Sequence, residues 1–282
     1  IKGVSKETSK FVSAVSGTII CVEVEGQFFF EDISIERTGD NTGDLLSISA
    51  TETKVISCSF MGNNVDSDNC GDGIWSTGVN AGVIKNCVVS GCRNGIIISG
   101  DSRTTISNNI CGMNLRNGIR VESAKAELTG NRCEENCYDG ISFVKFATGT
   151  ASNNICRLNK FNGISVNDES HAELTGNRCE ENENVGILIS ESSKGTASNN
   201  ICRLNKLDGI RVTEKSRAEL TGNRCEENEI SGILFLKSSK GTASNNICRL
   251  NMLAGIVVFE ESQVELTGNR CEENENVGIL IS

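Results

Sequence analysis

A short acidic stretch contains the residues best suited to chemistry. The stretch 63–73 is NNVDSDNCGDG. It matches the first, third and sixth positions of a calcium-binding loop, but the fifth position is Cys70, and the twelfth is Thr77 where that loop has a bidentate glutamate. Two interpretations remain, a turn-rich loop or a binding site. The candidate binding residues are Asp66, Asp68 and Asp72.

The only histidine, His171, is a poor candidate for a catalytic base. At intervals of 46 residues its equivalents are Lys125, Arg217 and Gln263. A position that accepts such different side chains indicates a surface turn. The catalytic residues, if the protein is an enzyme, therefore remain unassigned.

Many of the fourteen cysteines are evenly spaced. A zinc site needs four converging ligands, and no CxxC pair starts one, so we predict no metal. Disulfides are disfavoured because equivalent residues on stacked strands lie farther apart than a bridge requires. We therefore predict a column of small buried thiols. So many free thiols also predict a reducing, cytoplasmic compartment, although a secreted or periplasmic location stays open. The regular series is Cys111, Cys133, Cys156, Cys179, Cys202, Cys225, Cys248 and Cys271.

An internal repeat positions these residues. A Gly-Ile pair recurs every 22 or 23 residues, and the later pairs are preceded by N-x-C-x-x-N. The motif gives two asparagine series, one starting at Asn109 and one at Asn114. Such short periods are typical of solenoids, in which each unit buries its inner face only by stacking on its neighbours. The glycines are Gly73, Gly95, Gly118, Gly140, Gly163, Gly186, Gly209, Gly232, Gly255 and Gly278.

Within a unit the apolar residues alternate with a period of two, as in GILIS and AELTG, which predicts strands. A leucine-rich repeat has a similar period but requires more leucines than these units contain. We therefore predict an all-β fold, a right-handed parallel β-helix with 22–23 residues per coil and a 46-residue double repeat. In that register, Arg203 lies between Glu180 and Glu226 on the neighbouring coils, and the asparagines and cysteines form ladders.

The repeat is regular only in the later part of the chain. We predict an N-terminal cap with irregular coils over 1–100 and regular coils over 101–282, as one continuous solenoid. Strand-like runs at 19–24, 28–35, 45–49 and 54–60 belong to the irregular part. Because the chain stops within a repeat, we expect it to be truncated at its C-terminus.

The composition restricts the partners. The net charge is −10 and the pI about 4.9, which argues against nucleic acid and against anionic membranes. Since no apolar run reaches 18 residues, no transmembrane helix is expected.

Units such as Gly195–Val212, GTASNNICRLNKLDGIRV, resemble the β-helix repeats of the pectin-lyase-like superfamily. The resemblance covers roughly residues 20–282. Similar repeats occur in carbohydrate-binding proteins, sugar hydrolases and some F-box receptors. It therefore implies the architecture, and it leaves lyase, epimerase, hydrolase and non-enzymatic binder as possible activities.

We therefore expect a non-catalytic repeat scaffold with an extended surface that binds a protein or glycan. The alternative is a carbohydrate-active lyase, epimerase or hydrolase with its site in the N-terminal coils, near Asp72, where Lys54, Lys85 and Arg93 could lie. The scarcity of aromatic residues for sugar stacking favours the scaffold. No cofactor is expected, and calcium enters only with the enzyme alternative. The sequence leaves the oligomeric state open.

Overall fold

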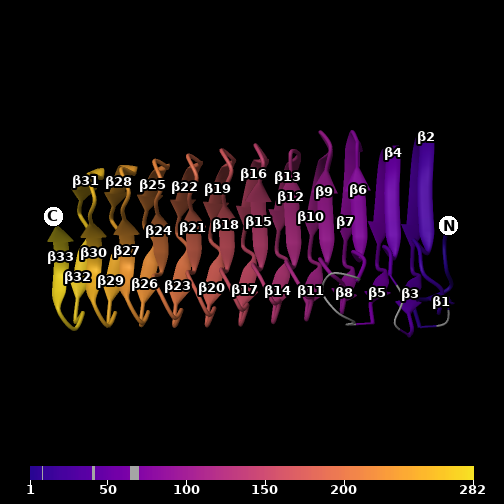
Figure 1. The fold of residues 1–282 in the computed structure, drawn as a ribbon, viewed down its shortest axis with the longest axis horizontal. Helices are drawn as coiled ribbons and strands as arrows, with labels where there is room; N and C mark the ends of the chain where they lie inside the picture. The colour runs from indigo at the N-terminus through magenta and orange to yellow at the C-terminus, as the bar shows by residue number, and fades with distance from the viewer. Residues whose placement is uncertain (8, 40–41, 64–69) are drawn as a thin grey trace.

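The chain winds into a single solenoid of stacked coils, shown from N to C in Figure 1. This computed structural model describes residues 1–7, 9–39, 42–63 and 70–282. In those ranges each regular coil contributes three short strands, neighbouring strands pair in parallel, and there is no helix. None of the described residues forms a helix that could span a membrane. The predicted right-handed parallel β-helix is confirmed.

One side of the solenoid is a twelve-stranded sheet that contains the regular cysteines, here called the cysteine sheet. Its strands are β1 (Lys10–Ser13), β3 (Ser34–Arg37), β5 (Ser59–Met61), β8 (Val88–Ser90), β11 (Ile110–Gly112), β14 (Arg132–Glu134), β17 (Ile155–Arg157), β20 (Arg178–Glu180), β23 (Ile201–Arg203), β26 (Arg224–Glu226), β29 (Ile247–Arg249) and β32 (Arg270–Glu272).

The strands that contain the isoleucine of each Gly-Ile pair form a second ladder, here called the isoleucine sheet. Its strands are β6 (Ile74–Thr77), β9 (Ile96–Ser99), β12 (Ile119–Glu122), β15 (Ile141–Val144), β18 (Ile164–Val166), β21 (Ile187–Ile189), β24 (Ile210–Val212), β27 (Ser231–Phe235), β30 (Ala254–Val258) and β33 (Val277–Ile281).

The third ladder, rich in outward threonine and serine, is here called the threonine sheet. Its strands are β7 (Ala81–Lys85), β10 (Arg103–Ser107), β13 (Lys125–Thr129), β16 (Thr148–Ser152), β19 (His171–Thr175), β22 (Lys194–Ser198), β25 (Arg217–Thr221), β28 (Lys240–Ser244) and β31 (Gln263–Thr267).

The isoleucine and threonine sheets are joined at the N-terminal end by two long strands, β2 (Ile20–Glu31) and β4 (Leu46–Ile56). The first residues of β4 pair with β6, and its last five pair with β7. Most of the runs expected at 19–24 and 28–35 therefore merge into β2, and most of those expected at 45–49 and 54–60 merge into β4, while their last residues lie in β3 and β5 of the cysteine sheet.

Side chains that point inward fill the solenoid with one continuous core. Cys156, Cys179 and Cys202 are direct register partners and are completely buried. All fourteen cysteines are free thiols. The predicted cysteine ladder is confirmed as a packed column of small side chains.

The asparagines form two buried ladders at the turns on either side of the cysteine sheet. The backbone N–H of Asn154 and its Nδ2 both donate to Oδ1 of Asn177, at 3.0 and 2.9 Å. The same Nδ2 also donates to the carbonyl oxygen of Leu128 at 3.1 Å. Each amide therefore satisfies turn groups on two coils, which explains why buried asparagine is tolerated.

The recurring glycine of the Gly-Ile pair is required by close backbone packing. A Cβ added at Gly186 would lie 2.6 Å from the carbonyl oxygen of Gly209 on the next coil. No side chain fits at that distance, so the repeat keeps glycine at this turn.

The sign-alternating column on the cysteine sheet also has the predicted register. Arg203 pairs in register with Glu180 on one side and Glu226 on the other. Its Nε lies 2.9 Å from Oε1 of Glu180, and that carboxylate also contacts Arg178 at 2.9 Å. Alternation thus places each of these glutamates between two guanidinium groups.

Candidate functional site

The three predicted aspartates are only partly visible in the structure. Asp66 and Asp68 lie outside the described residues. The Asp72 side chain is 1% exposed. Its carboxylate forms an ion pair with the Arg93 guanidinium, in which Nη2 lies 2.5 Å from Oδ2. It also accepts hydrogen bonds from the backbone N–H and the side-chain amide of Asn94. That ion pair raises the pKa of Arg93. Ligand binding by the three aspartates stays a prediction.

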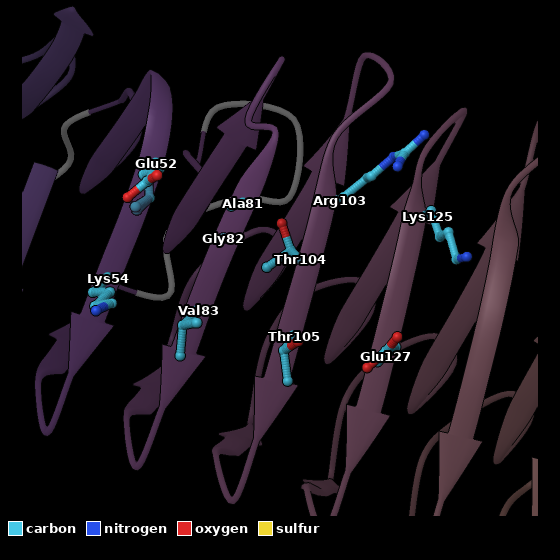
Figure 2. Close-up of a pocket in the computed structure, with 11 residues that line it drawn as sticks. Glu52, Lys54, Ala81, Gly82, Val83, Arg103, Thr104, Thr105, Lys125 and Glu127 are labelled. Atoms are coloured by element: carbon cyan, nitrogen blue, oxygen red, sulfur yellow. The ribbon is translucent and has the colours of Figure 1, made fainter. Parts of the chain in front are cut away.

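A different site is visible on the outer face of the threonine sheet. A groove of about 500 Å³ crosses β4, β7, β10 and β13 near the N-terminal end. Figure 2 shows its residues on four adjacent strands, with Glu52 and Lys54 on one side and Arg103, Lys125 and Glu127 on the other. The predicted irregular coils and the first regular coils therefore share this site.

The hollow arises because β7 carries small side chains where its neighbours carry long ones. Ala81 stands in register with Glu52, and Gly82 with Thr53 and Thr104. Gly82 is a buried position behind this face, where an added Cβ would lie 2.5 Å from Oγ1 of the buried Thr104. The groove is thus a local gap in an otherwise filled surface.

Cations dominate the groove walls. Lys54 Nζ lies 5.1 Å from the ring centroid of Phe29, a cation–π contact that holds the ammonium at the groove edge. Glu52 accepts a hydrogen bond from Gln27 Nε2 at 2.8 Å. Arg103 and Lys125 form no ion pair with any residue in the described ranges. These two side chains are therefore available to an anion.

Two buried hydroxyls lie beneath the groove. Thr53 is 1% exposed and Thr104 is 5% exposed, and both line the hollow. Among the described residues, neither Oγ1 has a hydrogen-bond partner. Both side chains take inward positions of their strands, as Val55 and Ile106 do, so these hydroxyls belong to the core side of the sheet and not to the surface that a ligand in the groove contacts.

The carboxylates of the groove are poorly placed for acid–base chemistry on one bond. Glu52 and Glu127 lie on β4 and β13, three strand spacings apart, or about 14 Å. Paired carboxylates in glycosidases lie roughly 5–10 Å apart. The arrangement suits binding of an extended polar molecule.

The sequence did not predict this groove, because the repeat does not set the register of β7 against β4. The step from Glu52 to Ala81 is 29 residues, whereas the regular coils take 22 or 23. His171 was expected in a turn, but it is the first residue of β19, exposed on the threonine sheet. Reading every 23 residues, in addition to every 46, would have shown that this position is repeatedly cationic.

The chain belongs to the right-handed β-helix family, because the family model described as right handed beta helix region matches residues 139–282. The model described as periplasmic copper-binding protein (NosD) matches residues 31–206, so the chain belongs to that family as well. No curated protein matches the sequence.

Solved structures share the fold at low sequence identity. The A-module of the mannuronan C-5 epimerase AlgE4 from Azotobacter vinelandii is 14% identical, with a TM-score of 0.73 over 94% of this chain and 88% of that one. The periplasmic alginate epimerase AlgG is 16% identical, with a TM-score of 0.54 over 89% and 76%. A tailspike domain of bacteriophage CBA120 is 12% identical, with a TM-score of 0.54 over 90% and 42%.

The expected cytoplasmic location is wrong. The NosD family, to which the chain belongs, is described as periplasmic, and this contradicts a cytoplasmic location. The inference failed because free thiols need a reducing compartment only when oxidants can reach them. Most cysteines here are enclosed in the core, so their number does not report the compartment.

The described residues do not fit the copper implied by the NosD description. They contain no group of three or more His, Cys, Asp and Glu side chains that could hold a metal. The buried cysteines of the core stand in a line from coil to coil instead of converging on one point, which does not suit the coordination of a copper ion. The described residues therefore do not fit a copper site.

Proposed function

We propose that this β-helix is a non-catalytic scaffold that binds a glycan along the outer face of the threonine sheet. The observation that carries the proposal is the groove over β4, β7, β10 and β13, with a floor of small residues and walls of charged side chains. Such a groove accepts a linear polar molecule without enclosing it, as extended repeat surfaces do.

The groove offers groups that match a sugar chain. Thr105 supplies an exposed hydroxyl, Glu52 and Glu127 supply hydrogen-bond acceptors, and Lys54 supplies a donor with a fixed position. These groups bind hydroxyl-rich ligands without the aromatic platforms that many sugar sites use. Glycan-active proteins with the same fold, such as the alginate epimerases, make a glycan the first ligand class to test.

The absence of a compact acid–base pair in the groove supports a binding role. General acid–base catalysis needs both groups within hydrogen-bond reach of the reacting atoms. The groove carboxylates are about 14 Å apart along the sheet, and the regular coils repeat similar environments, which does not favour an asymmetric catalytic site.

The test is a panel of acidic and neutral polysaccharides, measured for binding by calorimetry and for conversion by product analysis. We expect binding with no cleavage and no epimerisation, with and without calcium. Ala81→Trp should abolish binding, because its ring fills the hollow from the exposed side of β7. The matched control, Ile110→Trp, places the same ring at an exposed position of the cysteine sheet and should bind normally.

Conversion of any glycan would overturn the scaffold proposal and support the enzyme alternative. A calcium-dependent reaction lost in Asp66→Asn/Asp68→Asn would place that chemistry at the predicted acidic loop. Failure of every glycan to bind would overturn glycan binding itself.

A further inference from the structure

We propose that the glycan is a carboxylate-bearing polymer and that its binding site continues from the groove along a row of unpaired cations on the threonine sheet. This inference rests on the proposed glycan-binding function and specifies its ligand. The row, here called the cation column, consists of Arg103, Lys125, Lys194, Arg217 and Lys240, and it is interrupted by Thr148 and His171.

The register places these side chains in one line. Lys125 pairs with Arg103 on one side and with Thr148 on the other, and His171 then pairs with Lys194. Adjacent strands of a sheet lie about 4.8 Å apart. Each member opens its strand at an exposed position, so the column faces solvent along its whole length.

No carboxylate within the described part of the chain forms an ion pair with the cation column. None of its side chains lies within 4 Å of a carboxylate oxygen. In contrast, every arginine at the outward ends of β14 to β32 forms an ion pair, as Arg203 does with Glu180. The same solenoid therefore pairs its charges on one sheet and leaves a row of one sign on another.

This row has an electrostatic cost to the free protein. Like charges directly opposite each other on neighbouring strands destabilise a sheet. The cost is not imposed by the overall composition, because the protein carries a net charge of −10. A bound polyanion would offset the repulsion, so the column is best explained as a ligand surface.

The column and the groove are continuous. Arg103 and Lys125 belong to both, and a hollow of about 520 Å³ at Arg217 and Lys240 extends the surface toward the C-terminal end. A linear polymer lying along the solenoid axis would meet a new coil every ~4.8 Å, close to the length of one sugar residue in an extended glycan.

The neighbouring columns favour a glycan over a nucleic acid. Next to the cations, Glu127, Thr150, Glu173 and Thr196 alternate from coil to coil. Beyond them lies a ladder of serine and threonine hydroxyls, such as Thr175 with Ser198 at 3.1 Å. These hydroxyls and carboxylates can hydrogen-bond the hydroxyl groups that a polyuronate carries along its length and that a DNA backbone lacks.

Nucleic-acid surfaces also use aromatic side chains to stack bases. The outward positions of β10, β13, β19, β22, β25 and β28 carry no Phe, Tyr or Trp. The chemistry therefore indicates a polymer that carries both carboxylates and hydroxyls, such as a polyuronate.

The experiment compares a charge-removing pair in the column with a matched pair outside it. Lys194→Gln/Lys240→Gln removes two column cations far from the groove. Lys160→Gln/Lys206→Gln removes the same charge from exposed positions on the loops after the cysteine sheet. Full-length protein is titrated with polymannuronate, polygalacturonate, its fully methyl-esterified form and an oligothymidylate, each at low and high salt.

We expect both polyuronates to bind, with affinity that falls as salt rises. The column pair should weaken this binding about five-fold or more, since each exposed ion pair contributes up to roughly 1 kcal/mol. Lys160→Gln/Lys206→Gln should change the affinity for the polyuronates less than two-fold. The fully methyl-esterified polymer should not bind.

Other outcomes would overturn the inference in distinguishable ways. Equal loss in both variant pairs would show that only the net charge matters. Salt-independent binding of neutral glycans, unchanged in the column pair, would refute the polyanion site but leave glycan binding intact. Preference for the oligothymidylate would identify a nucleic-acid surface, and no binding of any polysaccharide would refute the proposed function itself.

Discussion

Replacing Arg203 by glutamate should destabilise the middle of the solenoid. Arg203 lies in register between Glu180 and Glu226, and its guanidinium contacts Glu180 at 2.9 Å. Both glutamates are only 4% exposed. Arg203→Glu would remove one ion pair and place three carboxylates in adjacent positions of a partly buried row.

The magnitude follows from the strand spacing. Two like charges about 4.8 Å apart repel by roughly 3 kcal/mol at an effective dielectric constant near 20, and by about 1 kcal/mol in water. Two such contacts arise, but Arg178 and Arg224 still bind the outer carboxylates, and the exposed side of the row is screened. We expect a net loss of about 2 kcal/mol in the free energy of unfolding.

The assay is denaturant unfolding followed by circular dichroism at low and high salt. Arg203→Gln removes the ion pair without adding a like charge, and should cost about 1 kcal/mol. The charge-matched control is Lys206→Glu, at an exposed loop position of the same coil. Because solenoids can unfold in parts, hydrogen exchange of β20, β23 and β26 gives a local readout. Equal stability of Arg203→Glu and Lys206→Glu at low salt would refute the stacking argument.

Three further outcomes test the interior. Burial raises the pKa of Asp139, so the folded state becomes less stable as the pH rises above the normal range of carboxyl pKa values. Asp139→Asn should therefore stabilise the protein by about 1 kcal/mol at pH 7 and have little effect at pH 3. Thermal unfolding at the two pH values measures this difference. Asn177→Ala removes the acceptor of both Asn154 donors and should cost about 3 kcal/mol in denaturant titrations, whereas a cost below 1 kcal/mol would contradict the ladder argument. In thiol titrations the exposed Cys21 and Cys137 should react in the native state and the buried cysteines only after unfolding; rapid native reaction of most thiols would show that the column is open.

The sequence by itself determined the fold and the regular coils. A period of 22 or 23 residues aligns Gly186 with Gly209, and an inward strand residue with its copy one coil away. Because each coil packs only on its neighbours, the period fixes the contacts. The asparagine ladders, the buried cysteines and the position of Arg203 therefore followed from spacing alone.

Only the tertiary structure decided where the first coils align. The steps before residue 100 differ in length, so the sequence could not show that Ala81 stands opposite Glu52 and opens a groove. Nor could it show that Asp72 is buried against Arg93.

The cation column was present in the sequence but was overlooked. Reading every 46 residues placed His171 with Lys125 and Arg217 but left out the interleaved Lys194 and Lys240. Whether these charges form ion pairs depends on the distances between side chains on neighbouring strands. The periodicity of the sequence does not give those distances. The structure supplies those distances, and they separate a neutralised row on the cysteine sheet from an open one on the threonine sheet.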